Sequence, residues 1–131
     1  MIYLWIALGS ALGGIARYWF SGIITASLGE TFPWGTILVN ILGCFAIGFF
    51  VALTEPNGQL AVNTQTKHFF ITGLCGGFTT FSAFSFQTLQ LAHHRESLLS
   101  GANIIFSVGL CLASVWIGFA LATALSQLKG I

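Results

Sequence analysis

The sequence carries very little charge. Only 5% of its 131 residues are Asp, Glu, Lys or Arg, and aspartate is missing altogether. A soluble domain carries about 25% charged residues, so this composition excludes an ordinary soluble protein. The hydrophobic fraction of 56% and the mean hydropathy of +0.91 instead predict an all-α membrane protein that is surrounded by a lipid bilayer.

The scarcity of charge also excludes several classes of function. The four basic residues form no stripe that could bind nucleic acid, and neither a phosphate loop nor a nucleophile–base pair indicates an enzyme. A proton-coupled drug exporter, which is another small four-span architecture, needs a carboxylate within the membrane. The glutamates Glu30, Glu55 and Glu96 all lie in predicted loops, which argues against that alternative.

Cysteine is also rare. Only Cys44, Cys75 and Cys111 occur, and each lies inside an apolar run. We interpret them as small packing residues rather than as a disulfide or a metal site. The first residues, Met-Ile-Tyr-Leu-Trp, lack the positive charge that begins a signal peptide, so we expect them to start a membrane helix.

Apolar sequence is abundant and forms four runs, each long enough for the roughly 20 helical residues that cross a bilayer. The predicted spans cover about residues 2–26, 33–54, 68–91 and 97–125. No internal repeat or linker divides the chain, so residues 1–131 are expected to form a single four-span domain. Gly9 and Gly13 have the small-xxx-small spacing that lets membrane helices approach closely.

The few basic residues bear on orientation in the membrane. Lys67 and Lys129 fall on one predicted side, and Arg17 and Arg95 fall on or near the other. The orientation of a membrane protein follows the excess of Lys and Arg in the short loops on one side. Here each side has two basic residues, so neither orientation is favoured. We therefore expect the chain to insert both ways and to pair as an antiparallel, dual-topology dimer.

The centre of the third run does not suit an ordinary membrane helix. Gly76 and Gly77 each weaken a helix by about 1 kcal/mol relative to alanine, and hydroxyl side chains follow at Thr79, Thr80, Ser82 and Ser85. Interrupted backbone at membrane depth is tolerated only where it is buried in protein or lines a cavity. Membrane proteins also build ion sites from the free carbonyls of such breaks. We predict a break near Gly76–Thr80 and an ion site beside it.

Phenylalanines are interleaved with these hydroxyls. Phe78, Phe81 and Phe84 follow one another at a spacing of three. On a helix that resumes after the break, this spacing places them along one side.

Polar residues in the other runs have two interpretations each. Asn40 either forms a hydrogen bond between helices or faces a pore as a donor. Arg17 either snorkels to the membrane boundary or attracts anions at a vestibule. Asn103, Ser107 and Cys111 are spaced four apart and share a helix face. They form either polar contacts between helices or a track along an ion path.

Three motifs stand out in this pattern. They are Gly13-Gly14-x-x-Arg17-Tyr18, Pro33-Trp34-Gly35-Thr36-x-x-Val39-Asn40-x-x-Gly43 and Gly73-x-x-Gly76-Gly77-x-Thr79-Thr80-Phe81-Ser82-x-Phe84-Ser85. With these motifs the sequence resembles the Fluc (CrcB-type) fluoride channels across all four spans. The resemblance implies passive export of fluoride through a multi-pass protein of the inner or plasma membrane. A non-transporting assembly subunit, in which the polar residues only pack helices, is the remaining alternative.

The resemblance also implies an architecture and a set of site residues. It implies an antiparallel homodimer with two fluoride pores and a central structural sodium ion. Backbone carbonyls of Gly76 and Thr79 would hold the sodium, and Arg17 would lie near the vestibule. The implied pore residues are Phe81, Phe84, Asn40, Ser107, Thr80 and Ser82, with the two phenylalanines meeting fluoride through their ring edges.

The sequence departs from the family pattern at a few positions. Ala83 stands where Thr is usual, Gln87 where Glu is expected, and Asn103 where Tyr is common. We assign Gln87, Asn103 and Cys111 to the polar track, whose shape these changes affect. Some members of the family pair different subunits, so a heterodimer with a related subunit is the alternative to a homodimer.

Overall fold

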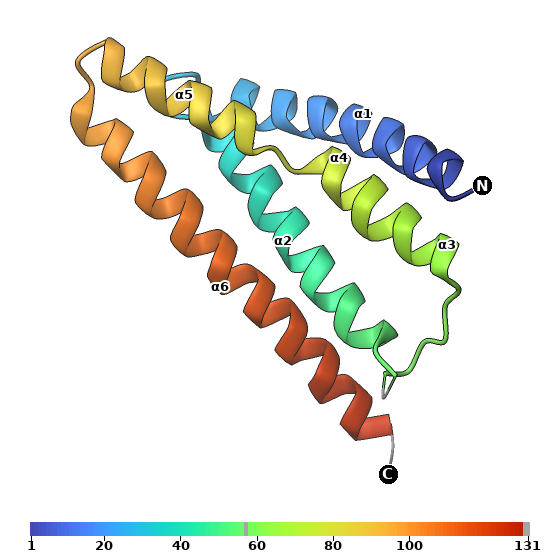
Figure 1. The fold of residues 1–131 in the computed structure, drawn as a ribbon. Coiled ribbons are helices and arrows are strands. Elements are labelled where there is room, and N and C mark those ends of the chain that lie inside the picture. Colours follow the sequence, from blue (N-terminus) through green and yellow to red (C-terminus); the bar gives the residue numbers. More distant parts are fainter. Residues whose placement is uncertain (57, 130–131) are drawn as a thin grey trace.

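The computed structural model describes residues 1–56 and 58–129. The side chain of Lys129, one of the four basic residues used in the orientation argument, lies outside the described part. Over these residues the chain is helical and contains no strand. The elements are α1 (Ile2–Leu28), α2 (Trp34–Thr54), α3 (Thr64–Lys67), the π-helix η1 (His68–Cys75), α4 (Gly76–Phe78), α5 (Phe81–His93) and α6 (Ser97–Lys129) (Figure 1). The prediction of an all-α protein with four long helices, the third of them interrupted, is confirmed.

Three of the long helical stretches have the length and apolarity of membrane spans. They are Trp34–Thr54, Thr64–His93 and Ser97–Leu128, with mean hydropathies of 2.4, 1.4 and 2.3. The fourth, α1, has 27 residues, or about 40 Å at 1.5 Å per residue, but it includes Arg17 and several tyrosine and tryptophan residues, which lower its mean hydropathy. The third stretch begins four residues before the predicted span, and α6 continues beyond the predicted end at residue 125.

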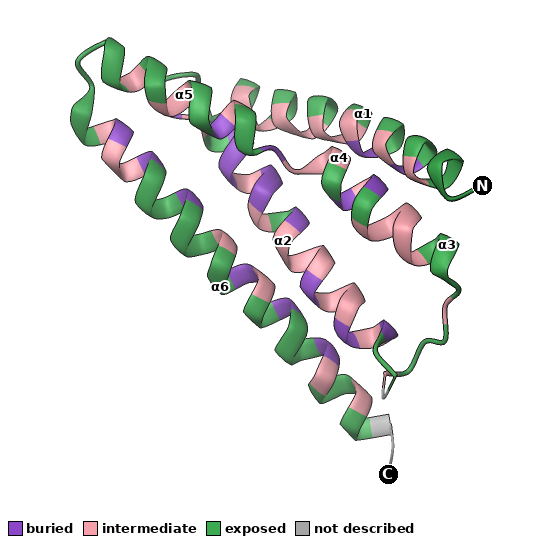
Figure 2. Cartoon of the chain, viewed as in Figure 1, coloured by how far each residue is buried: buried purple, intermediate pink, exposed green. Residues whose placement is uncertain are grey.

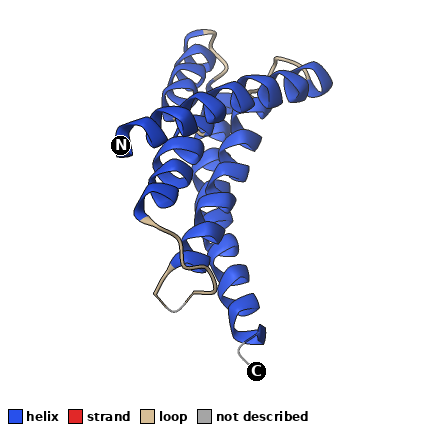
Figure 3. Ribbon diagram, turned by 90° about the vertical axis from the view of Figure 1, so that its right-hand side faces the viewer, coloured by secondary structure: helices blue, strands red, loops and turns tan. Residues whose placement is uncertain are grey.

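The helices pack as two pairs. In Figure 1, α2 and α6 lie side by side and run in the same direction, whereas α1 lies along the third stretch; Figure 3 shows the same arrangement after a quarter turn. A Cβ atom at Gly9 or Gly13 would collide with the backbone of η1 and α4. The small-xxx-small pair therefore lets two backbones touch, as its spacing predicted.

The break in the third stretch consists of two threonines. Thr79 (φ −81°, ψ 158°) and Thr80 (φ −151°, ψ 115°) are extended, whereas Gly76 remains helical at φ −63° and ψ −37°. The break thus lies at the C-terminal end of the predicted Gly76–Thr80 region. The double glycine has a different role, because a Cβ on Gly77 would lie 2.6 Å from the carbonyl oxygen of Ser10 in α1. Gly77 provides close packing and does not interrupt the helix.

Buried residues concentrate on the inner faces of the helices, most densely on α2, while the outer faces of α1, α5 and α6 are exposed (Figure 2). The buried set contains many small or polar side chains, including Thr36, Asn40, Asn103 and Ser107. Many of the exposed side chains are large and apolar. Such a surface suits a surrounding of lipid or of further protein rather than water.

Candidate functional site

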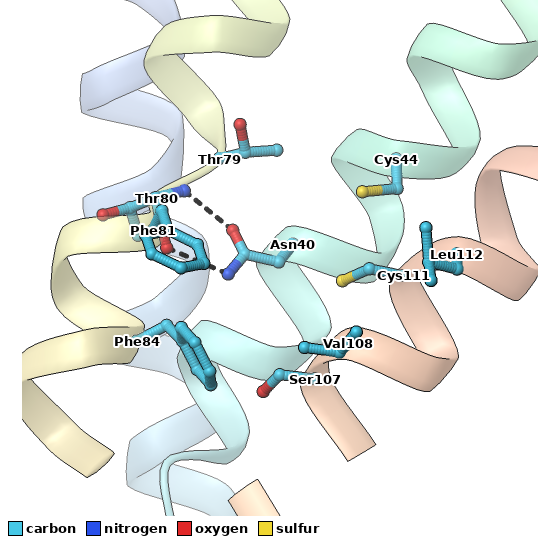
Figure 4. Close-up of a pocket in the computed structure, with 10 residues that line it drawn as sticks. All are labelled: Asn40, Cys44, Thr79, Thr80, Phe81, Phe84, Ser107, Val108, Cys111 and Leu112. Carbon is cyan, nitrogen blue, oxygen red and sulfur yellow. Dashed lines mark hydrogen bonds between the residues drawn. The ribbon is translucent and has the colours of Figure 1, made fainter. Parts of the chain in front are cut away.

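A groove of about 300 Å³ lies where the break meets α2, α5 and α6. Figure 4 shows the residues that line it: Asn40, Cys44, Thr79, Thr80, Phe81, Phe84, Ser107, Val108, Cys111 and Leu112. The groove thus brings together predicted pore residues from α5 and α6, which follow each other along the chain, and from α2, which is distant in the sequence. Ser82 is absent from this lining and is exposed, although its hydroxyl lies 3.2 Å from that of Thr80.

Asn40 holds the break in place from α2. Its Nδ2 donates to the carbonyl oxygen of Thr80 at 3.1 Å, and the Thr80 N–H donates to Asn40 Oδ1 at 2.7 Å. One side-chain amide therefore satisfies both backbone groups of a buried, non-helical residue, which would otherwise cost about 1–3 kcal/mol each. Both interpretations of Asn40 apply, since it bonds between helices and also lines the groove.

The same hydrogen bonds leave two carbonyl groups without their helical donors. In a continuous helix the N–H of Thr80 would donate to Gly76, and the N–H of Ala83 would donate to Thr79. Here the first donates to Asn40 Oδ1 and the second to Thr80 Oγ1 at 3.1 Å. Among the described backbone hydrogen bonds outside the helices, no other N–H takes their place. The carbonyls of Gly76 and Thr79 thus lack the hydrogen bonds that a continuous helix would give them.

Two phenylalanines occupy the α5 side of the groove. The rings of Phe81 and Phe84 are 5.2 Å apart between centroids and tilted by 55°. Phe84 is only 8% exposed, whereas Phe81 is 76% exposed in the single chain. Phe78 does not continue their row, contrary to the expectation from its spacing. It pairs with Phe20 of α1 at 6.3 Å, because the extended threonines separate it from α5.

A chain of hydrogen bonds connects α5 to the groove through α6. Thr88 Oγ1 donates to the carbonyl oxygen of Phe84 at 2.7 Å, and Asn103 Nδ2 donates to Thr88 Oγ1 at 2.8 Å. Ser107 Oγ then donates to Asn103 Oδ1 at 3.1 Å. Asn103 is 1% exposed and fixes this chain, and Ser107 is its member that lines the groove. Cys111 lines the groove one turn further along α6.

Gln87 lies in a different place from the polar track to which the sequence assigned it. It lines a second cavity of about 1170 Å³, together with Arg17 and Glu30. Its Oε1 is buried and accepts no hydrogen bond from any described residue. Arg17 lines this second cavity, and both interpretations of it remain open. Thr80 lines both cavities, so the break forms part of the wall between them.

Two residues in or beside the groove were missed by the sequence reasoning. Thr88, which does not line the groove, was given no role, yet its hydroxyl connects Phe84 to Asn103. Cys44 had been interpreted as packing, yet it lines the groove. A usable signal existed for Cys44, since it follows Asn40 by four residues and therefore shares its helix face.

Comparison with known proteins gives a consistent result. A family model described as "CrcB-like protein, Camphor Resistance (CrcB)" matches residues 4–119. A "Fluoride-specific ion channel FluC" of Methylocella silvestris is 51% identical over 130 residues, covering 99% of both chains. Another of that name, from Opitutus terrae, is 50% identical and covers 98% of both. A "Fluoride-specific ion channel FluC 2" of Bradyrhizobium diazoefficiens is 49% identical over 92% of this chain and 88% of its own.

These matches extend over almost the whole chain, and the matched range of the family model contains the segments that form the groove. A family model that covers residues 4–119 and relatives near 50% identity leave no room for a different assignment. The chain belongs to the CrcB family, whose similar members here are named as fluoride-specific ion channels and not as enzymes.

Proposed function

We propose that this protein is a passive, fluoride-selective channel. The observation that carries the proposal is the groove at the break, where a paired Phe81 and Phe84 face Asn40 and Ser107. The names of the similar relatives support fluoride as the ion. The groove contains no charged side chain among its lining residues, so an anion would meet only polar and aromatic groups.

Such a lining suits conduction of a small anion. An aromatic ring is negative on its face and positive at its edge, so a ring edge attracts an anion weakly. Conduction requires an ion to bind well enough to enter and weakly enough to leave. Asn40 adds one N–H that its two bonds to Thr80 leave unused. Arg17, at the second cavity, would raise the local concentration of anions before they enter.

The second part of the proposal is an antiparallel dimer with two pores. Phe81 is 76% exposed in the single chain although it lines the groove, so one face of the groove is open to a partner. The balanced basic residues favour insertion in both orientations. Bradyrhizobium diazoefficiens has relatives named FluC 1 and FluC 2, which keeps a heterodimer as the alternative assembly.

The third part is a structural sodium ion at the centre of that dimer. The free carbonyls of Gly76 and Thr79 are hard oxygen ligands, and Gly76 is exposed where a second chain could approach. Two opposed chains would offer four such oxygens. When bound, sodium would satisfy these carbonyls and add positive potential near the anion path. The residues present therefore fit the ion, and Asn40 and Thr80 keep the carbonyls free.

The direction of transport follows from the membrane potential. In the inner or plasma membrane, 100 mV negative inside is worth about 2.3 kcal/mol for a single charge. That energy corresponds to roughly a fifty-fold gradient of fluoride between outside and inside. Passive conduction therefore exports fluoride without a coupled reaction.

Ion efflux from liposomes tests the proposal. The purified protein is reconstituted into liposomes loaded with potassium fluoride or potassium chloride, and loss of each anion is recorded with an ion-selective electrode. We expect rapid loss of fluoride and retention of chloride. Equal loss of both would contradict selectivity, and no loss from a well-folded preparation would favour the assembly-subunit alternative or a missing partner.

A further inference from the structure

Two of the three cysteines lie on the wall of the groove that α2 and α6 form together. Cys44 projects from α2 and Cys111 from α6, and in Figure 4 both sulfur atoms point to the side of the groove where Asn40 lies. Both thiols line the same groove, and neither forms a disulfide. Cys75, the third cysteine, is buried and does not line the groove. The cysteines are therefore not equivalent packing residues.

Tight packing between α2 and α6 fixes the position of this pair. Gly48 packs directly on the backbone of Val115, and these two residues lie four positions after Cys44 and Cys111. Because α2 and α6 run in the same direction, the thiols lie one helical turn from that contact on both helices. A second contact involves Ile41, three residues before Cys44, whose carbonyl oxygen accepts a hydrogen bond from Ser114 Oγ at 2.8 Å. These two contacts on α2, one after Cys44 and one before it, set the register of the two thiols.

We propose that Cys44 and Cys111 bind a soft, two-coordinate metal ion, and that an ion held there blocks the groove. Thiolates are the preferred ligands of soft metal ions. Among the described residues, no group of three or more His, Cys, Asp or Glu could hold a metal. The pair therefore suits an ion that needs only two sulfur ligands.

The chemistry of binding balances without an oxidant. With Hg²⁺, two S–H bonds break, two sulfur–metal bonds form, and two protons leave to water. No atom changes its oxidation state. The product is neutral, which matters because an isolated charge in the low-dielectric membrane interior is costly. Harder ions such as Mg²⁺ find no carboxylate in the groove and are not expected to bind.

The blocking part rests on the proposed function, because the ion would lie beside Phe84 and Ser107 on the anion path. Binding itself does not depend on that function. Two separate measurements are therefore needed. One records the ultraviolet absorbance of mercury–thiolate bonds as Hg²⁺ is titrated into purified protein, and the other records fluoride efflux from liposomes treated with Hg²⁺.

Serine and alanine variants locate the site. The variant Cys75→Ala should bind a single Hg²⁺ per chain and lose most of its fluoride efflux, which dithiothreitol should restore. In that background, Cys44→Ser and Cys111→Ser should each require at least about tenfold more Hg²⁺ for half-inhibition, because the second thiol no longer adds an intramolecular bond. Each flux is compared with the same variant before treatment.

Other results would overturn the proposal. Unchanged titration and inhibition in Cys44→Ser, or loss of both in Cys75→Ala, would show that the pair is not the site. If Hg²⁺ bound stoichiometrically to Cys44 and Cys111 but fluoride efflux did not fall, the part of the proposal that the bound ion blocks the groove would be wrong. If the untreated protein carried no fluoride, the proposed function would fail, and the absorbance titration alone would decide whether the metal site exists.

Discussion

The two halves of the third helical stretch pack in different ways. Before the break, η1 and α4 lie against α1 with backbone on backbone, and glycines at both surfaces allow the contact. After the break, α5 is fixed to α6 by side-chain hydrogen bonds through Thr88 and Asn103. The first half is closely packed backbone on backbone, and the second borders the groove. One helical stretch thus combines a closely packed segment with a segment that lines the proposed ion path.

The strongest test of this contrast is Asn40→Ala, which acts at the junction of the two halves. Both backbone groups of Thr80 would lose their partner, at about 1–3 kcal/mol each. We expect fluoride efflux to be lost and thermal stability in detergent to fall. Thr123→Ala removes an exposed hydroxyl that bonds only within α6 and should change neither. Normal efflux in Asn40→Ala would show that the break needs no support from α2.

The next test is Phe84→Ile, on the groove side. The substitution keeps an apolar side chain but removes the ring edge, so efflux should fall severely while the protein stays folded. Efflux is recorded by fluoride electrode, and folding by gel filtration. Phe86→Ile is the matched control, since Phe86 lies on the same helix, is exposed and does not line the groove. Equal effects of both substitutions would remove the aromatic explanation.

On the scaffold side, Gly13→Ala should mainly affect stability. The added methyl group would lie 2.8 Å from the Phe78 nitrogen and would collide with the carbonyl oxygen of Leu74. Overpacking of this kind costs about 1–3 kcal/mol. Gly14→Ala is the control, because nothing lies within 4 Å of its Cβ position. Thermal unfolding in detergent should distinguish the two; if they melt alike, the two backbones are less closely packed than we describe.

The smallest effect is expected for Asn103→Ala. It removes the bonds from Asn103 to Thr88 and Ser107 but leaves both residues with their hydroxyl groups. A loss of about 1 kcal/mol or somewhat more in stability and a partial fall in efflux should follow. Ser126→Ala, which loses only a bond within its own helix, should leave both unchanged. An effect as large as that of Asn40→Ala would contradict the order proposed here.

The sequence was enough to predict the fold class and most of the groove. Apolar runs predict spans because a bilayer imposes their length, and the hydroxyls at Thr79 and Thr80 marked the break. The predictions from sequence were wrong where one residue type can have two structural roles. Gly77 was read as a helix breaker, but it is a site of close approach to Ser10, and that role depends on a contact with a distant helix. Gln87 was assigned to the polar track with Asn103 and Cys111, whereas it lines the cavity of Arg17 and Glu30; its place along its own helix does not show which neighbour it faces.

The dimensions of α6 have a consequence for the membrane itself. Its 33 residues extend about 50 Å at 1.5 Å per residue, whereas the hydrocarbon core is about 30 Å thick. A tilt of about 40°, which is at the upper end of the usual range, would still leave about 38 Å along the bilayer normal. The ends of α6 therefore project into the headgroup layers. Because α6 carries Ser107 and Cys111, a change in bilayer thickness that alters its tilt would also alter the width of the groove.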